Sequence, residues 1–173
     1  MDFSISDKMQ TILEMINEFV DKELIPLENE YLTKPRDTPE FEKAVKDKRQ
    51  KVKQMELWAP NHPEELGGMG LGLMEHALVS EALGRCTLGH LVFGCQAPDA
   101  GNIEILHKYG TEEQQDTYLK PLVAGDIRSC FSMTEVDMPG SNPVLLETTA
   151  EKDGDDYIIN GHKWFTSSAD GSK

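Results

Sequence analysis

The sequence predicts an α+β fold: an all-α, orthogonal helical bundle over residues 1–125, then an incomplete antiparallel β-domain over residues 126–173. Before residue 125, apolar residues recur at spacings of three and four, as in amphipathic helices. After it, short strand-like runs are separated by turn residues. Helical and strand-like segments do not alternate along the chain, so a parallel βαβ sheet is not expected.

Caps and breakers divide the first part into helices. Apolar residues from Met9 to Leu24 form one stripe, which Ser6 or Asp7 is expected to cap and Pro26 to end or kink. Asp99 and Thr111 are further expected caps, the second in a capping box with Gln114. The remaining helices are expected over residues 39–57, 73–83, 88–96, 99–109 and 111–123, with glycines at 84, 110 and 125 ending three of them.

A loop rich in glycine and proline spans residues 59–72. Its glycines superficially resemble a phosphate-binding loop. However, no strand precedes the run and the GxGxxG pattern is not matched, so a tight connector between helices is favoured.

Strand-like runs cover residues 128–134, 148–152, 157–159 and 162–166. Asp153-Gly154-Asp155-Asp156 predicts a hairpin turn, and Asn160-Gly161 a second one. Three or four strands are few for a self-standing sheet, so we expect the natural sequence to continue past residue 173, or the chain to be a short form.

The charge and cysteine content limit the possible functions. The net charge of −14 argues against nucleic acid or an anionic membrane as a partner, because phosphates would be repelled. The three cysteines form no CxxC pair, which indicates free thiols in a reducing compartment. No histidine spacing is typical of a metal site. Without a signal sequence or an apolar run of about 20 residues, a cytoplasmic protein with no membrane span is expected.

Two segments carry candidate chemistry. In residues 130–143 a strand-like run leads into a turn whose backbone N–H groups and hydroxyl suit an anion such as pyrophosphate. In residues 160–168, Trp164 and Thr166 lie two positions apart, so a strand would present both on one face, toward a planar ring. Taken alone, each segment also fits an ordinary turn or a core tryptophan.

Together and in this order, the two segments resemble the acyl-CoA dehydrogenase family. Residues 65–72, 109–114 and 118–125 add to the resemblance, which covers essentially the whole chain. The resemblance implies an N-terminal helical domain, a middle β-domain, a C-terminal four-helix domain and FAD as cofactor. Because relatives are usually homotetramers, the resemblance also implies a homo-oligomer. It further implies a role in fatty-acid β-oxidation.

Site residues follow from the resemblance, position by position. Phe131, Met133 and Thr134 would line the flavin, and Ser141 would contact a phosphate region of FAD or of the CoA substrate. Trp164 would lie along the ring and Thr166 near flavin N5. The full set of implied cofactor-binding residues is Phe131, Met133, Thr134, Gly140, Ser141, Trp164, Phe165 and Thr166. The sequence departs from the family in having Val136 after Thr-Glu, and one more residue before Gly140-Ser141.

The implied reaction is α,β-dehydrogenation of an acyl-CoA thioester to the 2-enoyl-CoA, with electrons passing to an electron-transfer flavoprotein. In the family a glutamate of the C-terminal domain removes the α-proton. No position here matches it, and Glu135 is expected to be structural. We therefore expect the 173 residues alone to be inactive, to hold flavin weakly and to self-associate or need a partner chain. Three alternatives are a non-catalytic helical module, one subunit of a heteromeric flavoprotein, and a flavin hydroxylase that uses oxygen.

Overall fold

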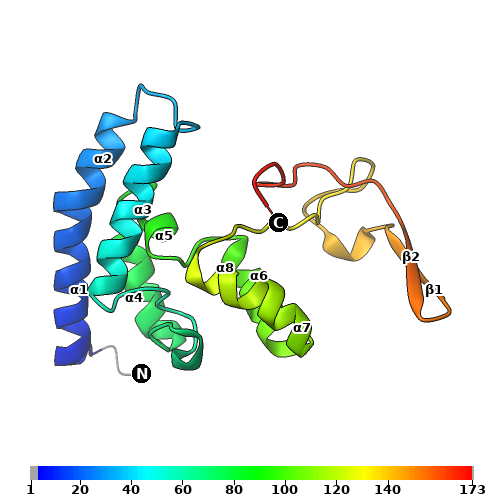
Figure 1. The fold of residues 1–173 in the computed structure, drawn as a ribbon, viewed down its shortest axis with the longest axis horizontal. Coiled ribbons are helices and arrows are strands. Elements are labelled where there is room, and N and C mark those ends of the chain that lie inside the picture. Colours follow the sequence, from blue (N-terminus) through cyan, green and yellow to red (C-terminus); the bar gives the residue numbers. More distant parts are fainter. Residues whose placement is uncertain (1–3, 173) are drawn as a thin grey trace. The chain divides into compact units, whose positions relative to one another are not determined.

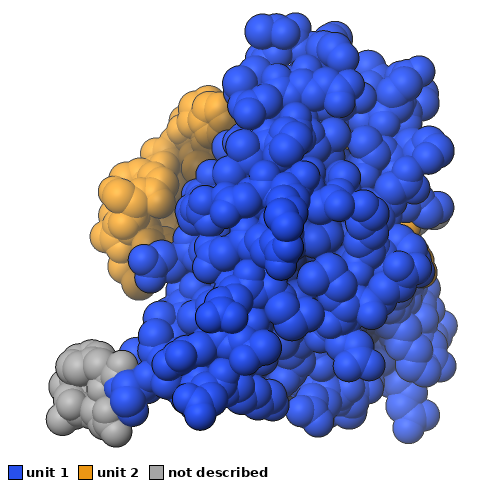
Figure 2. All heavy atoms as spheres, turned by 90° about the vertical axis from the view of Figure 1, so that its left-hand side faces the viewer, with its two compact units in different colours: residues 1–125 blue, residues 126–173 orange. Residues whose placement is uncertain are grey.

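The computed structural model describes residues 4–172 and divides into two compact units, Met1–Gly125 and Asp126–Lys173. The first unit is built from helices, and the second contains a two-stranded sheet (Figure 1). Figure 2 colours the first unit blue and the second orange. Among the described residues, no helix has both the length and the apolar character needed to cross a bilayer.

The first helical rod continues through the proline that was expected to end or kink it. Ser6 caps its start by accepting a hydrogen bond from the backbone N–H of Met9. Pro26 lacks an N–H, and in a regular helix its ring would collide with the carbonyl of the residue four positions earlier. A π-helical segment directly before it widens the turn and absorbs this conflict. The rod consists of α1 (Asp7–Phe19), η1 (Val20–Leu24) and α2 (Ile25–Glu30).

The same arrangement recurs at Pro121. There, too, a π-helical segment precedes the proline, and Gly125 ends the last helix with a left-handed φ of 73°. Thr111 and Gln114 form the predicted capping box. The elements are α7 (Glu112–Gln114), η3 (Gln115–Leu119) and α8 (Lys120–Ala124).

The middle helices follow the prediction with three corrections, of which the first is that the helix from Pro39 ends at Gln54 and not near residue 57. α3 (Pro39–Gln54) starts at the Thr38 cap and runs beside the first rod, to which Glu23 ties it through Lys48 and Lys51 (Figure 1). α5 (Gly89–Val92) stops short of residue 96 because Gly94 adopts a left-handed φ of 69°. Asp99 is the first residue of its helix and not the cap, which is Pro98. The other two elements are α4 (Leu73–Leu83) and α6 (Asp99–Tyr109).

The core of the first unit centres on Phe93. This side chain is fully buried and meets Phe19 edge to face, with ring centroids 5.6 Å apart. Its carbonyl accepts the N–H of Ala59 at 2.8 Å, which anchors the start of the 59–72 loop to the core. Other fully buried side chains of this core are Ile16, Val20, Leu24, Val52, Val79, Leu83 and Val92.

The 59–72 loop uses its own backbone donors internally. The N–H groups of Gly68, Gly70 and Leu71 donate to the carbonyls of residues 63, 62 and 60, at 3.0, 2.8 and 3.0 Å. A short 3₁₀ turn, η2 (Glu64–Leu66), lies within it. Donors that are already bonded cannot cradle a phosphate without breaking the loop, so the structure supports the tight connector.

Three partly or fully buried histidines of this unit have a lowered pKa. Burial lowers the pKa of His62, His76 and His90 from 6.5, and the neighbouring His90 further lowers the pKa of His76. Two neighbouring charged groups act on the pKa of His62 in opposite directions, since Glu104 raises it and His76 lowers it.

We predict that the first unit loses stability as the pH falls from 7 to 5. Below pH 6.5 the unfolded chain binds protons that the folded histidines resist, so acidification favours unfolding. Urea unfolding followed by far-UV circular dichroism at several pH values measures this. In His62→Gln the free energy of unfolding should fall less steeply as the pH is lowered. An equal slope in both proteins would show that the burial of His62 does not contribute.

The second unit contains a single two-stranded sheet within the described residues. β1 (Thr149–Asp153) and β2 (Asp156–Asn160) pair antiparallel around the predicted turn, where Gly154 has a φ of 63°. The segments at 128–134 and 162–166 do not form the predicted strands. Their backbone pairing is reduced to one isolated bridge, between Glu135 and Lys163, and a single bridge is too short to make a strand ladder.

Gly161 is not part of a turn, contrary to the prediction. An added Cβ there would lie 2.1 Å from Oγ1 of Thr148, so the glycine is required by close approach of the two segments. A short 3₁₀ turn, η4 (Pro143–Leu145), precedes the hairpin. The hairpin itself is exposed, including the large apolar side chains of Tyr157, Ile158 and Ile159.

Candidate functional site

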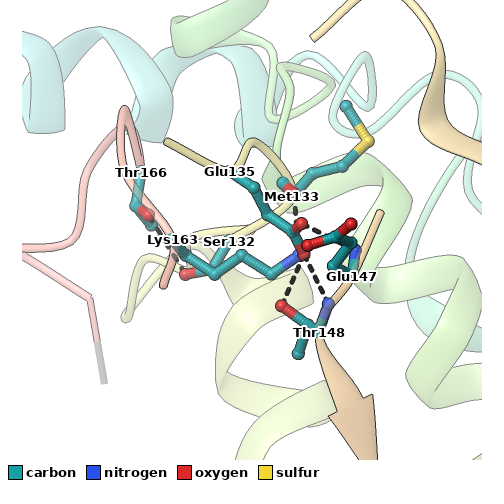
Figure 3. A network of polar contacts seen from close by, with 7 residues as sticks. All are labelled: Ser132, Met133, Glu135, Glu147, Thr148, Lys163 and Thr166. Atoms are coloured by element: carbon teal, nitrogen blue, oxygen red, sulfur yellow. Dashed lines mark hydrogen bonds and ion pairs between the residues drawn. The ribbon is translucent and has the colours of Figure 1, made fainter. Parts of the chain in front are cut away.

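The two segments singled out from the sequence lie side by side in the second unit. The backbone N–H of Trp164 donates to the carbonyl of Thr134 at 3.1 Å. Two residues away on each segment, the hydroxyl of Thr166 donates to that of Ser132, also at 3.1 Å (Figure 3). The structure thus brings the segments that carry Thr134, Trp164 and Thr166 next to each other.

Large apolar side chains flank this junction and face solvent. Phe131 is 51% exposed, Met133 42% and Trp164 42%. The rings of Trp164 and Phe165 lie 4.6 Å apart at their centroids, and Phe165 is 78% exposed. Apolar groups of this size are usually buried, so their exposure on neighbouring segments marks a surface suited to an apolar ligand or partner.

Phe165 breaks the alternation on which the sequence argument relied. Its φ of 51° lies in the left-handed region, which a bulky residue rarely adopts. Trp164 and Thr166 therefore do not share a face by strand alternation. The Thr166 hydroxyl is placed instead by its bond to Ser132.

The Gly140-Ser141 turn lies against the same junction. A Cβ on Gly140 would meet Cγ2 of Thr134 at 3.5 Å, an ordinary contact distance. The turn is closed by the N–H of Asn142, which donates to the carbonyl of Pro139 at 3.2 Å. Ser141 is exposed at this turn, within the same unit as the Thr134 junction.

A buried carboxylate ties the site together. Glu135 is only 6% exposed and accepts hydrogen bonds from the N–H groups of Glu147 at 2.7 Å and Thr148 at 2.9 Å (Figure 3). The Thr148 hydroxyl donates to it as well. The Lys163 ammonium lies 2.7 Å from the same carboxylate and also donates to the carbonyl of Met133 at 2.9 Å.

These donors hold Glu135 in its ionised form. The N–H of Glu147 contributes most, followed by the Lys163 ammonium and the Thr148 hydroxyl, and together they lower the pKa from 4.5 to about 2. A carboxylate with so low a pKa is a poor proton acceptor at neutral pH. The structure therefore supports the expectation that Glu135 is structural.

Comparison with known proteins identifies the family. The profile of the acyl-CoA dehydrogenase N-terminal domain matches residues 6–126, and that of the acyl-CoA dehydrogenase middle domain matches residues 130–173. The chain belongs to the acyl-CoA dehydrogenase family.

Individual relatives agree with this assignment. Human acyl-CoA dehydrogenase family member 11 is 38% identical over 172 residues, which cover 96% of this chain and 22% of that protein. The Mycobacterium tuberculosis protein FadE2, named as an acyl-CoA dehydrogenase, is 36% identical, with 98% of this chain and 42% of that protein covered. This chain therefore spans less than half the length of these relatives.

Solved structures share the fold. One, assigned to an acyl-CoA dehydrogenase of Mycobacterium abscessus, superposes with a TM-score of 0.84 at 36% identity, covering 95% of this chain and 43% of that one. Another, PigA with FAD and proline, gives 0.74 at 26% identity, covering 99% and 43%. The α+β fold class predicted from the sequence is thereby confirmed, and FAD is the cofactor of the family.

The residues present fit a flavin. A tricyclic ring needs flat apolar contacts and hydrogen-bond donors at its edge. Trp164, Phe131 and Met133 supply exposed apolar surface, and the Thr134 and Thr166 hydroxyls lie on the same pair of segments. Among the described residues, no group of three or more potential ligands is arranged to hold a metal ion.

The sequence argument missed Lys163, Thr148 and Gly161 as parts of this site. Lys163 stands inside the quoted motif, beside Trp164, yet no role was assigned to it. A signal was available, because a carboxylate directly after an apolar strand-like run needs a cation or several N–H donors if it is buried. Which residues supply them depends on contacts between distant segments and is not visible in the local pattern.

Proposed function

We propose that this chain forms part of an FAD-dependent acyl-CoA dehydrogenase, which converts an acyl-CoA thioester to the 2-enoyl-CoA. The family assignment and the names of the relatives support this reaction class. The observation that carries the proposal is the pairing of the Thr134 segment with the Trp164–Thr166 segment, beside exposed apolar side chains.

In this proposal the chain contributes one side of the cofactor site. Phe131, Met133 and Trp164 would contact the flavin ring, and the Thr134 hydroxyl would donate to its edge. The Thr166 hydroxyl would donate to the ring in place of its hydrogen bond to Ser132. Ser141, on its exposed turn, would contact a phosphate of FAD or CoA. The bound flavin supplies the acceptor for the hydride that leaves the substrate β-carbon.

The general base is proposed to be a carboxylate that residues 1–173 do not supply. Glu135 is the buried carboxylate nearest the junction, and its four hydrogen bonds and pKa of about 2 make it unsuitable. An electron-transfer flavoprotein is the proposed acceptor. A chain in a solved structure described as the electron transferring flavoprotein of Acidaminococcus fermentans shares this fold at 29% identity, with a TM-score of 0.68.

Flavin binding tests the cofactor site. Trp164→Ala is expected to weaken FAD binding by about fivefold, because a ring contact of this kind contributes on the order of 1 kcal/mol. Tyr157→Ala is the matched control, since Tyr157 is an exposed aromatic of the same unit that lies on the hairpin. Titration of FAD with both variants measures the difference. Equal affinities would reject the placement of the flavin at Trp164.

A turnover assay of the FAD-loaded protein tests whether these residues supply the general base. The 173 residues, loaded with FAD and given acyl-CoA with a dye acceptor, are expected to show no turnover. Turnover that appears on adding a second chain would favour a heteromeric flavoprotein. Turnover by these residues alone would contradict the proposal that the base lies elsewhere, and Glu135→Gln would then show whether Glu135 is involved.

A further inference from the structure

Glu135 and Lys163 stand at the only backbone bridge between the two cofactor segments in the described part of this unit. We infer that these two residues form a positioning couple that fixes the register of Thr134 against Trp164. The inference rests on the proposed function, because it assigns the couple to the flavin site. Neither residue would touch the flavin; each acts through its neighbour in the chain.

The Lys163 side chain makes two of the contacts between the segments. Its ammonium bridges the Glu135 carboxylate at 2.7 Å and the Met133 carbonyl at 2.9 Å, and only 22% of the side chain is exposed. Thr134 lies between these two acceptors in the sequence. The ammonium therefore restrains the backbone on both sides of Thr134, while the next residue, Trp164, donates to the Thr134 carbonyl.

Glu135 adds a third segment to this assembly. Its carboxylate accepts the N–H groups of Glu147 and Thr148, which lead directly into β1. The two cofactor segments and the start of the hairpin thus converge on one carboxylate (Figure 3). A neutral side chain would lose the charge-assisted part of these bonds, and the segments would be free to slip against each other.

The stabilising contribution of the Glu135–Lys163 couple depends on pH. Glu135 titrates with a pKa of about 2 in the folded chain, against 4.5 for an unperturbed glutamate, and the groups that face it are Lys163, Thr148 and the N–H of Glu147. Its stabilising contribution is complete above pH 4.5 and is lost as the pH falls toward 2, where the folded-state carboxylate takes up a proton.

Amide hydrogen exchange of the flavin-free protein is the first test. In Lys163→Met the exchange of the Trp164 amide is expected to rise by about tenfold or more, because the loss of a charge-assisted bond costs on the order of 1.5 kcal/mol. The amide of Ile158, in the β1–β2 hairpin, should keep its wild-type rate. Lys163→Arg preserves the charge and should restore the Trp164 rate to within about threefold. Lys152→Met, which removes an exposed lysine of β1, is the matched control.

FAD affinity is the second test. Lys163→Met and Glu135→Gln are each expected to weaken FAD binding by about tenfold, and Lys163→Arg to recover most of the loss. Unchanged Trp164 exchange in Lys163→Met would overturn the inference. So would a parallel rise at Ile158, since that would make the couple a support of the hairpin and not of the register. If the wild type binds no FAD, the proposed function fails, while exchange at Trp164 still decides whether the couple sets the register.

Discussion

Replacing Phe93 by alanine is expected to lower the free energy of unfolding of the N-terminal unit by about 3–5 kcal/mol. Phe93 is fully buried, so truncation removes the ring from the core and leaves a cavity in its place. It also removes the edge-to-face contact with Phe19, which contributes about 0.5–1.5 kcal/mol beyond area burial. Since Phe93 also anchors Ala59 through its carbonyl, relaxation around the cavity would reach the 59–72 loop.

Urea unfolding followed by far-UV circular dichroism measures this loss. Tyr118→Ala is a suitable control, because Tyr118 is an aromatic of the same unit that is 45% exposed, and surface changes of this kind stay within about 0.5 kcal/mol. Phe93→Leu, which keeps most of the volume, should fall between the two. A loss below about 1 kcal/mol in Phe93→Ala would mean that the site collapses around the smaller side chain and that the core is less rigid than its packing suggests.

Helices were predictable in this chain because their signals are local. Thr38 and Thr111 each accept a hydrogen bond from an N–H three residues ahead, so the cap and the residues it serves lie within one short stretch of sequence. The π-turns before Pro26 and Pro121 were not predicted. Around Pro26 the buried residues Val20, Leu24, Leu27 and Tyr31 still recur at spacings of three and four, so periodicity alone does not reveal the wider turn.

The second unit was harder to predict for a different reason. The β1–β2 hairpin is joined by a short turn, and its Asp-Gly signal was sufficient. Residues 128–134 have strand-like composition, but a strand exists only with a partner, and their pairing depends on residues some thirty positions away. The same holds for the site. The motif located Thr134 and Trp164, whereas the selection of Lys163 as the ion-pair partner of Glu135 is a long-range choice that composition does not encode.

Gly68→Ala is expected to destabilise the N-terminal unit by about 3 kcal/mol, the upper end of the usual cost of overpacking. An added Cβ at Gly68 would lie 2.2 Å from the carbonyl oxygen of His62 and 2.7 Å from that of Ala59. Both obstacles are backbone atoms, so no side-chain rotation can relieve the clash. The loop would have to open, breaking the hydrogen bond from the Gly68 N–H to the carbonyl of Pro63.

Gly101→Ala is the matched control for this substitution. Gly101 lies inside α6 with nothing within 4 Å of an added Cβ, so alanine there should raise stability by about 0.5–1 kcal/mol. The urea midpoints of the two variants should therefore shift in opposite directions from that of the wild type.

The comparison also separates the two interpretations of the glycine-rich loop over residues 59–72. If Gly68 were kept to let a phosphate approach the backbone, Gly68→Ala would weaken anion binding and leave the unfolding midpoint in place. If glycine is needed at position 68 because the backbone of Ala59 and His62 lies against its Cα, the urea midpoint of Gly68→Ala falls whether or not any anion is present.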